Sequence, residues 1–181
     1  MKVLKGKDVK IHDGDLRRRE KANRDYLMEL KSNNLLINYR IEAGRFTDRG
    51  IPADAHTGWE SPVCQLRGHF LGHWLSAAAI HYYTSGDMEL KVKADLIIDE
   101  LAECQKDNGG QWVGAVPEKY LHWIAKGKGV WAPQYNLHKI LMGLVDMYKY
   151  AGNQKALEIA DNFSDWFLDW SGTFTREEFD T

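Results

Sequence analysis

Apolar residues recur along this chain at steps of three and four, the period of helices that bury one face. The clearest run lies in residues 88–106, where the repeating positions are Leu90, Ala94, Ile97, Ile98, Leu101 and Cys104. Asp87 precedes the run as a helix cap, and an Asn-Gly-Gly sequence at 108–110 ends it. The pattern predicts a helix with one buried stripe and a charged outer side.

Similar spacing predicts further helices, separated by glycine and proline. A helix over 15–31, with Asp13 as a candidate cap, has its apolar side at Leu16, Tyr26, Leu27 and Leu30. The other predicted helical segments are 33–43, 66–84, 117–125, 134–151 and 154–171, with a loop at 44–65 and an extended stretch at 109–116. The predicted fold class is therefore all-α.

A weak internal repeat with a period of 65 to 66 residues underlies these helices. Placing His73 over His138 aligns two apolar helices, and the Gly-Asp turn at 86–87 then matches the Gly-Asn turn at 152–153 with a slip of one residue. Helical hairpins at this spacing suit an (α/α) toroid, in which the apolar first helix is inner and the charged second helix is outer.

A ring of six such hairpins needs well over roughly 300 residues at this period. Residues 1–181 hold only two to three hairpins with long loops, and the sequence ends at TREEFDT without a turn or cap signal. We therefore expect the N-terminal portion of a single (α/α)6-barrel domain. The alternative is a small domain that closes by dimerisation, so a homo-oligomer stays open.

Composition excludes several classes of protein. Apolar residues make up 44% and charged residues 28%, which is typical of a globular chain. The net charge of −2 argues against nucleic acid and anionic membranes as partners, and no apolar run is long enough to span a bilayer. The N-terminus lacks the apolar core of a signal peptide, which predicts a cytoplasmic location, with secretion of a longer parent left open.

Two residue types add to this picture. The seven tryptophans are roughly three times the average usage, and their flat apolar faces suit sugar rings, although most single tryptophans are expected in the core. Cys64 and Cys104 are too few for a disulfide framework; one bridge is an option, and two buried thiols are favoured.

The densest polar group lies at residues 58–73 and contains Trp59, Glu60, Arg67, His69 and His73. The two histidines are four residues apart, so they share one face of a helix. That spacing can bind a metal, but the glutamate of the H-E-x-x-H pattern is missing and no third ligand is obvious. Donation to sugar hydroxyls is the favoured interpretation, with structural hydrogen bonding as the alternative. Arg67 could pair with Glu60 and hold the loop.

Two further groups are candidates. Trp131, Tyr135 and His138 converge at the start of a predicted helix, as in a sugar subsite, although capping and packing would also explain them. Gln111 or Glu118 could face the start of the same predicted helix. Glu118 has no convincing carboxylate partner for glycosidase chemistry, so no residue is assigned as catalytic.

The segments GWESPVCQLRGHFLGHWLSAAA (58–79), GDMELKVKADLIIDELAECQKDNGG (86–110) and VWAPQYNLHKILMGLVDMYKYAGNQKALEIADNFSDWF (130–167) resemble the N-terminal half of the catalytic domain of glycoside hydrolase family 127, the β-L-arabinofuranosidases. Residues 33–44 match as well, so the resemblance covers nearly the whole chain. It implies an (α/α)6 barrel that removes terminal β-L-arabinofuranose from plant-type glycans or arabinosylated glycopeptides.

The resemblance also implies a mechanism. A cysteine thiolate on a zinc ion, held by further cysteine and glutamate ligands, attacks the anomeric carbon, and a glutamate acts as acid and base. Those residues belong to the second half of the barrel, and Cys64 and Cys104 do not match them. The chain is thus expected to hold no metal or cofactor, with zinc in the full-length parent. By this resemblance, His138 matches a histidine that contacts the sugar, and His69 and His73 are also expected to contact it.

Three functions remain open at this point. The first is a partial glycoside hydrolase, inactive alone. The second is another (α/α) toroid enzyme, such as an unsaturated-uronide hydrolase or a polysaccharide lyase. Such an enzyme needs basic residues for a carboxylate, and the candidate site offers mainly Arg67 and Lys139. The third is a non-enzymatic helical carbohydrate-binding module.

Overall fold

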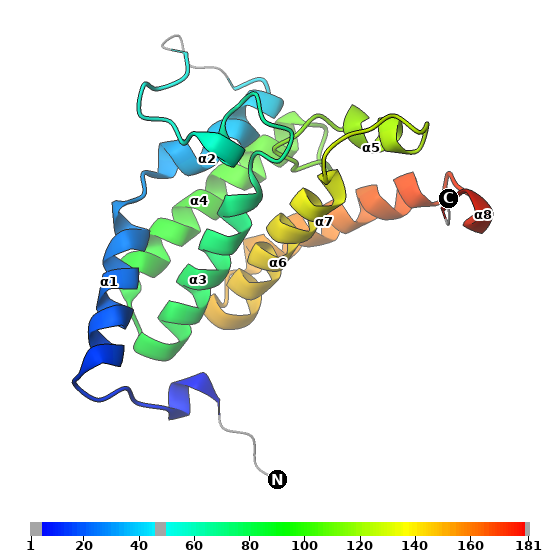
Figure 1. Ribbon diagram of the computed structural model, residues 1–181. Coiled ribbons are helices and arrows are strands. Elements are labelled where there is room, and N and C mark those ends of the chain that lie inside the picture. The colour runs from blue at the N-terminus through cyan, green and yellow to red at the C-terminus, as the bar shows by residue number, and fades with distance from the viewer. Residues whose placement is uncertain (1–4, 46–49, 180–181) are drawn as a thin grey trace.

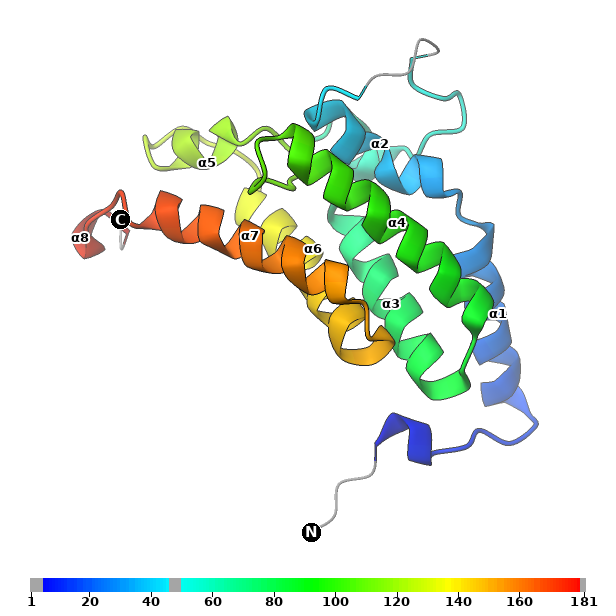
Figure 2. The same cartoon turned by 180° about the vertical axis from the view of Figure 1, so that it is seen from behind.

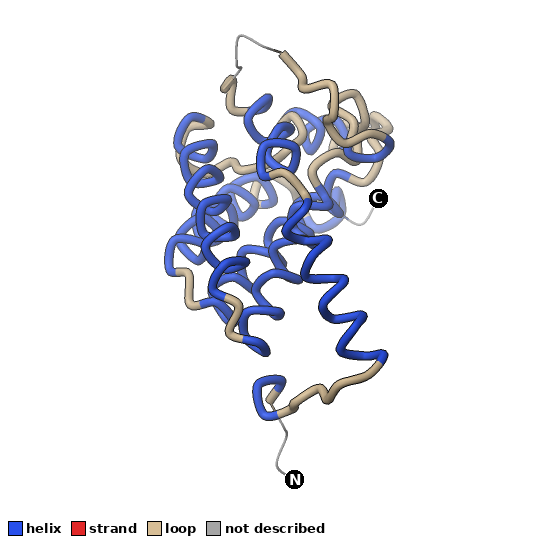
Figure 3. The backbone as a smooth tube through the Cα atoms, turned by 90° about the vertical axis from the view of Figure 1, so that its left-hand side faces the viewer, coloured by secondary structure: helices blue, strands red, loops and turns tan. Residues whose placement is uncertain are grey.

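The computed structural model describes residues 5–45 and 50–179, and within these ranges every regular element is helical (Figure 1). Figure 3 shows the same residues as helix and loop only. The all-α prediction is confirmed. The elements are η1 (Gly6–Asp8), α1 (Asp15–Glu29), α2 (Ser32–Glu42), η2 (Gly58–Glu60), α3 (His69–Ser85), α4 (Met88–Asp107), α5 (Lys119–Ile124), α6 (Pro133–Ala151), α7 (Gln154–Ser171) and α8 (Arg176–Phe179).

Two helical hairpins, α3–α4 and α6–α7, form the centre of the molecule. Helices α3 and α6 lie side by side and make the most extensive helix–helix contact of the described residues. Helices α4 and α7 return along their backs, as the reverse view in Figure 2 shows. Helices α1 and α2 cover the free side of the first hairpin. The first helices of both hairpins therefore make one layer and the second helices make another.

The turns of the two hairpins have the same construction. Gly86 and Gly152 both end their helices in the left-handed region, with φ of 76° and 68°. Asp87 then caps α4 by accepting from the Leu90 amide at 3.0 Å, and Asn153 caps α7 by accepting from the Ala156 amide at 2.9 Å. The weak repeat in the sequence thus corresponds to a repeated helix–turn–helix unit.

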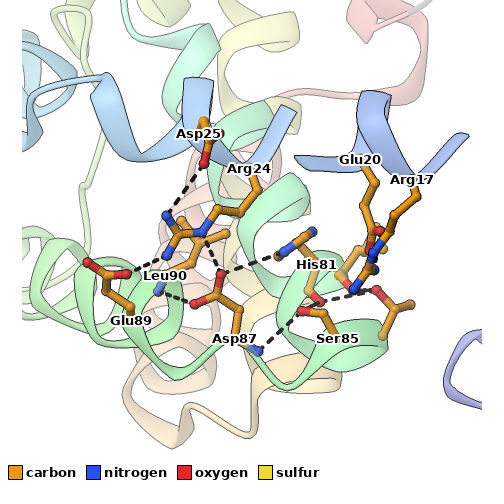
Figure 4. Close-up of polar contacts among 11 residues, drawn as sticks. Arg17, Glu20, Arg24, Asp25, His81, Ser85, Asp87, Glu89 and Leu90 are labelled. Carbon is orange, nitrogen blue, oxygen red and sulfur yellow. Dashed lines mark hydrogen bonds and ion pairs between the residues drawn. The ribbon is translucent and has the colours of Figure 1, made fainter. Parts of the chain in front are cut away.

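Asp87 also ties α1 to the first hairpin (Figure 4). The Nε of Arg24 on α1 donates to Asp87 Oδ2 at 2.8 Å, and a second guanidinium nitrogen donates to Glu89. His81 Nε2 lies 3.7 Å from the same Asp87 oxygen. The Arg24 guanidinium lowers the pKa of the Asp87 carboxyl, which keeps this cap charged.

Two glycines let α3 and α6 approach closely. A Cβ on Gly72 would lie 2.0 Å from the backbone oxygen of Lys139, and a Cβ on Gly143 would lie 2.7 Å from the backbone oxygen of Gly72. Neither glycine has a positive φ, so contact and not backbone conformation requires the missing side chain. This close contact brings the starts of the two helices, where the candidate residues lie, onto one surface.

The core confirms the stripe predicted on α4. Its buried residues include Leu90, Ala94, Ile97, Ile98, Leu101 and Cys104, all 1% exposed or less. Lys93, beside this stripe, donates to the carbonyl groups of Leu27, Met28 and Leu30 and so caps the end of α1. Four of the seven tryptophans are buried: Trp74, Trp112, Trp166 and Trp170.

Several local predictions were wrong. Gly14 and not Asp13 precedes α1, without a side-chain cap. The helix predicted from residue 66 begins at His69, because Gly68 adopts a left-handed conformation with φ of 88°. Leu16 and Tyr26 are 71% and 49% exposed, and Leu27 is the buried residue of α1.

The predicted loop at 44–65 contains the short helix η2, and the stretch at 109–116 forms turns and bends instead of a strand. Residues 1–4, 46–49 and 180–181 lie outside the described residues, so the expectations about a leader peptide and about the TREEFDT end fall partly there. None of the described helices has the length and apolar character needed to cross a membrane.

Candidate functional site

Five aromatic rings gather where α3 and α6 begin, and we refer to them as the aromatic–imidazole cluster: Trp59, His69, His73, Trp131 and Tyr135. The Trp59 ring lies 6.1 Å from that of Trp131 and 6.3 Å from that of His69. The His69 ring lies 5.9 Å from Tyr135 and 6.1 Å from His73. The structure therefore brings together two groups of candidates that lie about one repeat apart in the sequence.

The cluster is an open surface. Trp59 is 62% exposed, Trp131 is 49% exposed and Tyr135 is 40% exposed, whereas four other tryptophans lie in the core. Large exposed aromatic side chains are costly to leave in water, so such a group indicates a surface that binds something. Two cavities of about 630 and 730 Å³ lie elsewhere, beside α1 and the end of α3.

Glu60 supports the cluster from behind. One carboxylate oxygen accepts from the Gly68 amide at 2.8 Å, and the other accepts from the Phe70 amide at 3.0 Å. These amides open α3, where a negative charge is favoured by the helix dipole. The side chain of Glu60, predicted to contact substrate, is 14% exposed and is already engaged by protein groups.

The Leu66 carbonyl and Glu60 together fix the tautomer of His69. The Nδ1 atom of His69 lies 2.6 Å from Glu60 Oε1 and 3.0 Å from the carbonyl oxygen of Leu66. Both neighbours are acceptors, so Nδ1 carries a proton. In the neutral ring Nε2 is then an acceptor, which suits a hydroxyl group of a ligand.

The other two histidines differ in their surroundings. His73 Nε2 lies 3.3 Å from the hydroxyl oxygen of Tyr135. Burial, followed by the charges of Lys139, His69 and His138, lowers the pKa of His73, so this ring is neutral at neutral pH. His138 is exposed and, among the described residues, has no hydrogen-bond partner, so its ring nitrogens are open to a ligand.

Hydrogen bonds between side-chain amides and backbone groups fix the loop that carries Trp59 and Glu60. Gln65 accepts from the Trp131 amide through its side chain at 2.8 Å and from the Asn136 side chain through its backbone at 3.2 Å. Asn38 on α2 donates to the carbonyl oxygen of Glu60 at 2.9 Å. Sequence reasoning missed Gln65, Asn38 and Asn136, because lone amides in a sequence give no signal of the backbone groups they will meet.

Arg67 has a different partner from the one predicted. Its side chain is 8% exposed and donates to Glu42 at 2.7 Å and to the carbonyl oxygen of Cys64 at 3.0 Å, not to Glu60. Glu60 is occupied by the start of α3, which leaves Glu42 on α2 as the available carboxylate. A buried, paired guanidinium of this kind holds the loop and is closed to a ligand.

The structure does not join Gln111 and Glu118 to the cluster. The amide of Gln111 donates to Asp169 on α7 at 3.4 Å, and Glu118 accepts from the indole nitrogen of Trp166 at 2.6 Å. Lys139 does belong nearby, with its ammonium group 4.8 Å from the centre of the Tyr135 ring.

We expect Glu60→Gln to destabilise the fold by about 1–3 kcal/mol, since it removes a charge at the start of α3 and sets an amide donor against two backbone donors. The change should also weaken the preference of His69 for the Nδ1–H tautomer, because the charged acceptor of this pair is then lost and the Leu66 carbonyl remains. Thermal unfolding and long-range ¹H–¹⁵N correlation spectra of the histidine rings would measure both effects. Glu103→Gln, which alters a half-exposed ion pair with Arg45, is the matched control. An unchanged His69 tautomer would show that Glu60 acts only on the helix.

Comparison with known proteins places the chain in a family. A family model described as "Beta-L-arabinofuranosidase, GH127 catalytic domain" matches residues 8–181, almost the full length. A comparison with curated proteins found no match.

Proposed function

Because the chain belongs to the GH127 β-L-arabinofuranosidase catalytic-domain family, we propose that the aromatic–imidazole cluster binds a terminal β-L-arabinofuranosyl unit of a plant-type glycan or arabinosylated glycopeptide. The observation that carries this proposal is the convergence of Trp59, His69, His73, Trp131 and Tyr135 from two hairpins, with the Trp59, Trp131 and Tyr135 side chains exposed. His138 adds an imidazole beside them.

The chemistry of the cluster suits a neutral sugar. Exposed indole rings offer flat apolar faces to the C–H groups of a furanose ring. His69 Nε2, the His138 ring and the Tyr135 hydroxyl supply hydrogen bonds to the hydroxyl groups. Two basic side chains were predicted to bind a carboxylate, Arg67 and Lys139. Arg67 is paired with Glu42, which leaves Lys139 beside the Tyr135 ring. This arrangement favours a pentose over the uronate that an unsaturated-uronide hydrolase would bind.

We also propose that residues 1–181 form the N-terminal portion of a single (α/α)6 barrel. The repeated hairpins support this assignment, since α3 and α6 lie in one layer and α4 and α7 in the other. In a toroid of this kind the inner helices surround the central cavity. The cluster would then face that cavity from the starts of two neighbouring inner helices.

The zinc-bound cysteine implied by the family does not fit the described residues. Over 5–45 and 50–179, no group of three or more histidine, cysteine, aspartate or glutamate side chains is arranged to hold a metal. Cys104 is buried, and desolvation raises the pKa of its thiol to about 11, whereas a zinc ligand must be a thiolate. No step of the proposal passes through Cys104 or Cys64, and the described residues are assigned to sugar binding.

Two measurements on the 181-residue chain test this function. Titration with L-arabinose should give binding in the millimolar range or tighter, and an aryl β-L-arabinofuranoside should not be hydrolysed. Strong zinc-dependent turnover would contradict the assignment of this chain to substrate contacts alone. Absence of any L-arabinose binding would contradict the assigned site. Binding without turnover also fits a carbohydrate-binding module, which hydrolysis by a longer form of the protein would separate from a glycosidase.

His138→Ala should weaken L-arabinose binding about tenfold while leaving the fold intact. The loss of one hydrogen bond to a ligand is worth about 1–1.5 kcal/mol, close to a factor of ten. His138 is exposed and supports no other described residue by a hydrogen bond, so the melting temperature should move by no more than about 2 °C. If the variant unfolds instead, the imidazole has a structural role and the proposed ligand contact is wrong.

A further inference from the structure

A basic and aromatic segment lies beside the cluster. We propose that this segment, residues 118–130, binds the carboxylate groups of a uronate-bearing glycan to which the arabinofuranosyl unit is attached. The assignment of that glycan as the remainder of the substrate rests on the proposed function; the binding of uronate by the segment does not.

The charge of the segment differs from that of the chain. Lys119, Lys126 and Lys128 stand there with His122, while the whole chain has a net charge of −2. Among the described residues, no carboxylate forms an ion pair with any of the three lysines. The one acidic side chain of the segment, Glu118, accepts from the indole nitrogen of Trp166. The lysine charges are therefore available to an anionic ligand.

The aromatic side chains hold two of these charges in place. The ammonium groups of Lys119 and Lys128 lie 5.3 and 5.4 Å from the centre of the Trp123 ring. The Tyr120 ring packs against Trp123 at 5.5 Å, with an angle of 30° between the planes. Cation–π contacts restrict lysine side chains that would otherwise move freely, so less entropy is lost when a ligand binds.

The segment is attached to the core on one side and open on the other. Leu121 in the middle of α5 is fully buried, whereas Lys119, His122 and the two later lysines are exposed. Helix α5 lies at the end of the molecule where α3 and α6 begin (Figure 1). Lys128 is separated from Trp131 of the cluster by only two residues. A glycan whose terminal sugar occupies the cluster can therefore reach this segment.

The combination favours a uronate over other anions. Carboxylates pair with ammonium groups, and Lys119 and Lys128 offer two such groups beside the same Trp123 ring. A neutral glycan would gain nothing from the lysines. A nucleic acid would need a basic excess across the surface, which a chain of net charge −2 does not have.

The test is titration of the chain with tetragalacturonate, with maltotetraose as the neutral oligosaccharide and a short single-stranded DNA as the phosphate polyanion. At low ionic strength, where surface charges act most strongly, tetragalacturonate should bind more tightly than either. Lys119→Gln and Lys128→Gln should each weaken that binding about fivefold, and the double variant more. Lys128→Arg, which keeps the charge, should largely retain it.

Lys149→Gln is the matched control, because Lys149 is also exposed and lies 4.9 Å from the centre of an aromatic ring, that of Tyr150, far along α6. Equal loss in this variant would reduce the effect to net charge and overturn the proposal. Equal binding of maltotetraose, or tighter binding of the DNA, would also overturn it. His138→Ala should leave tetragalacturonate binding unchanged, so failure of the arabinose site and failure of this segment can be distinguished.

Discussion

Replacement of Gly72 by alanine is expected to destabilise the fold by about 3 kcal/mol or more, the upper part of the range for overpacked cores. The new Cβ would lie 2.0 Å from the backbone oxygen of Lys139 and 2.8 Å from the backbone nitrogen of Ile140. These are main-chain atoms of α6, so no side-chain rotation can relieve the contact. The helices α3 and α6 would have to move apart where they are in closest contact.

The separation should also affect the site, because Gly72 lies between His69 and His73 on α3. We expect the variant to lose L-arabinose binding together with stability. Chemical denaturation gives the free energy of unfolding, and Gly129→Ala provides the control. Gly129 has open space around its Cβ position and no positive φ, so alanine there should change stability by less than about 0.5 kcal/mol. Equal effects at both positions would show that the close approach of α3 and α6 is wrong.

Gly72 illustrates what the sequence alone could and could not give. The apolar periodicity predicted α4, α6 and α7 to within a residue or two, because amphipathic helices carry their own signal. A glycine inside an apolar helix is only a break from that pattern. Its function as a contact point depends on a helix that begins about 60 residues later, and no local rule identifies that partner.

The candidate site shows the same division. Resemblance and spacing selected His69, His73 and Tyr135, and the structure places these rings next to one another. The partners of charged side chains were harder to predict. Glu60 is bound to the start of α3 and Arg67 to Glu42, since each pairing depends on which groups the fold places within reach.

Exposure along α1 shows why periodicity alone can mislead. Leu16 and Leu27 were predicted to share one buried side, yet Leu16 is 71% exposed and Leu27 is 4% exposed. Only the last part of α1 reaches the core, where the Leu27 carbonyl group accepts from the indole nitrogen of Trp74 at 3.1 Å. A periodic pattern identifies the side of a helix that can be buried, but the neighbouring elements determine how far along the helix burial extends.

Leu101→Ala on α4 is expected to cost about 2–5 kcal/mol, the usual range for truncating a core leucine. Leu101 is fully buried within the stripe that faces the rest of the core, so the lost side chain leaves a cavity that rigid helices cannot close. Thermal or denaturant unfolding measures the change directly. L-arabinose binding by the folded fraction should be unaffected, because Leu101 lies on a helix of the second layer.

Leu96→Ala is the matched control for this prediction, since it makes the same chemical change on the same helix. Leu96 is 60% exposed and lies outside the buried stripe, so its truncation should change stability by about 0.5 kcal/mol or less. The difference between the two variants therefore measures burial and not helix propensity, which is the same for both. Similar losses at the two positions would mean that α4 has another face against the core, and the inner and outer layers assigned to the hairpins would have to be exchanged.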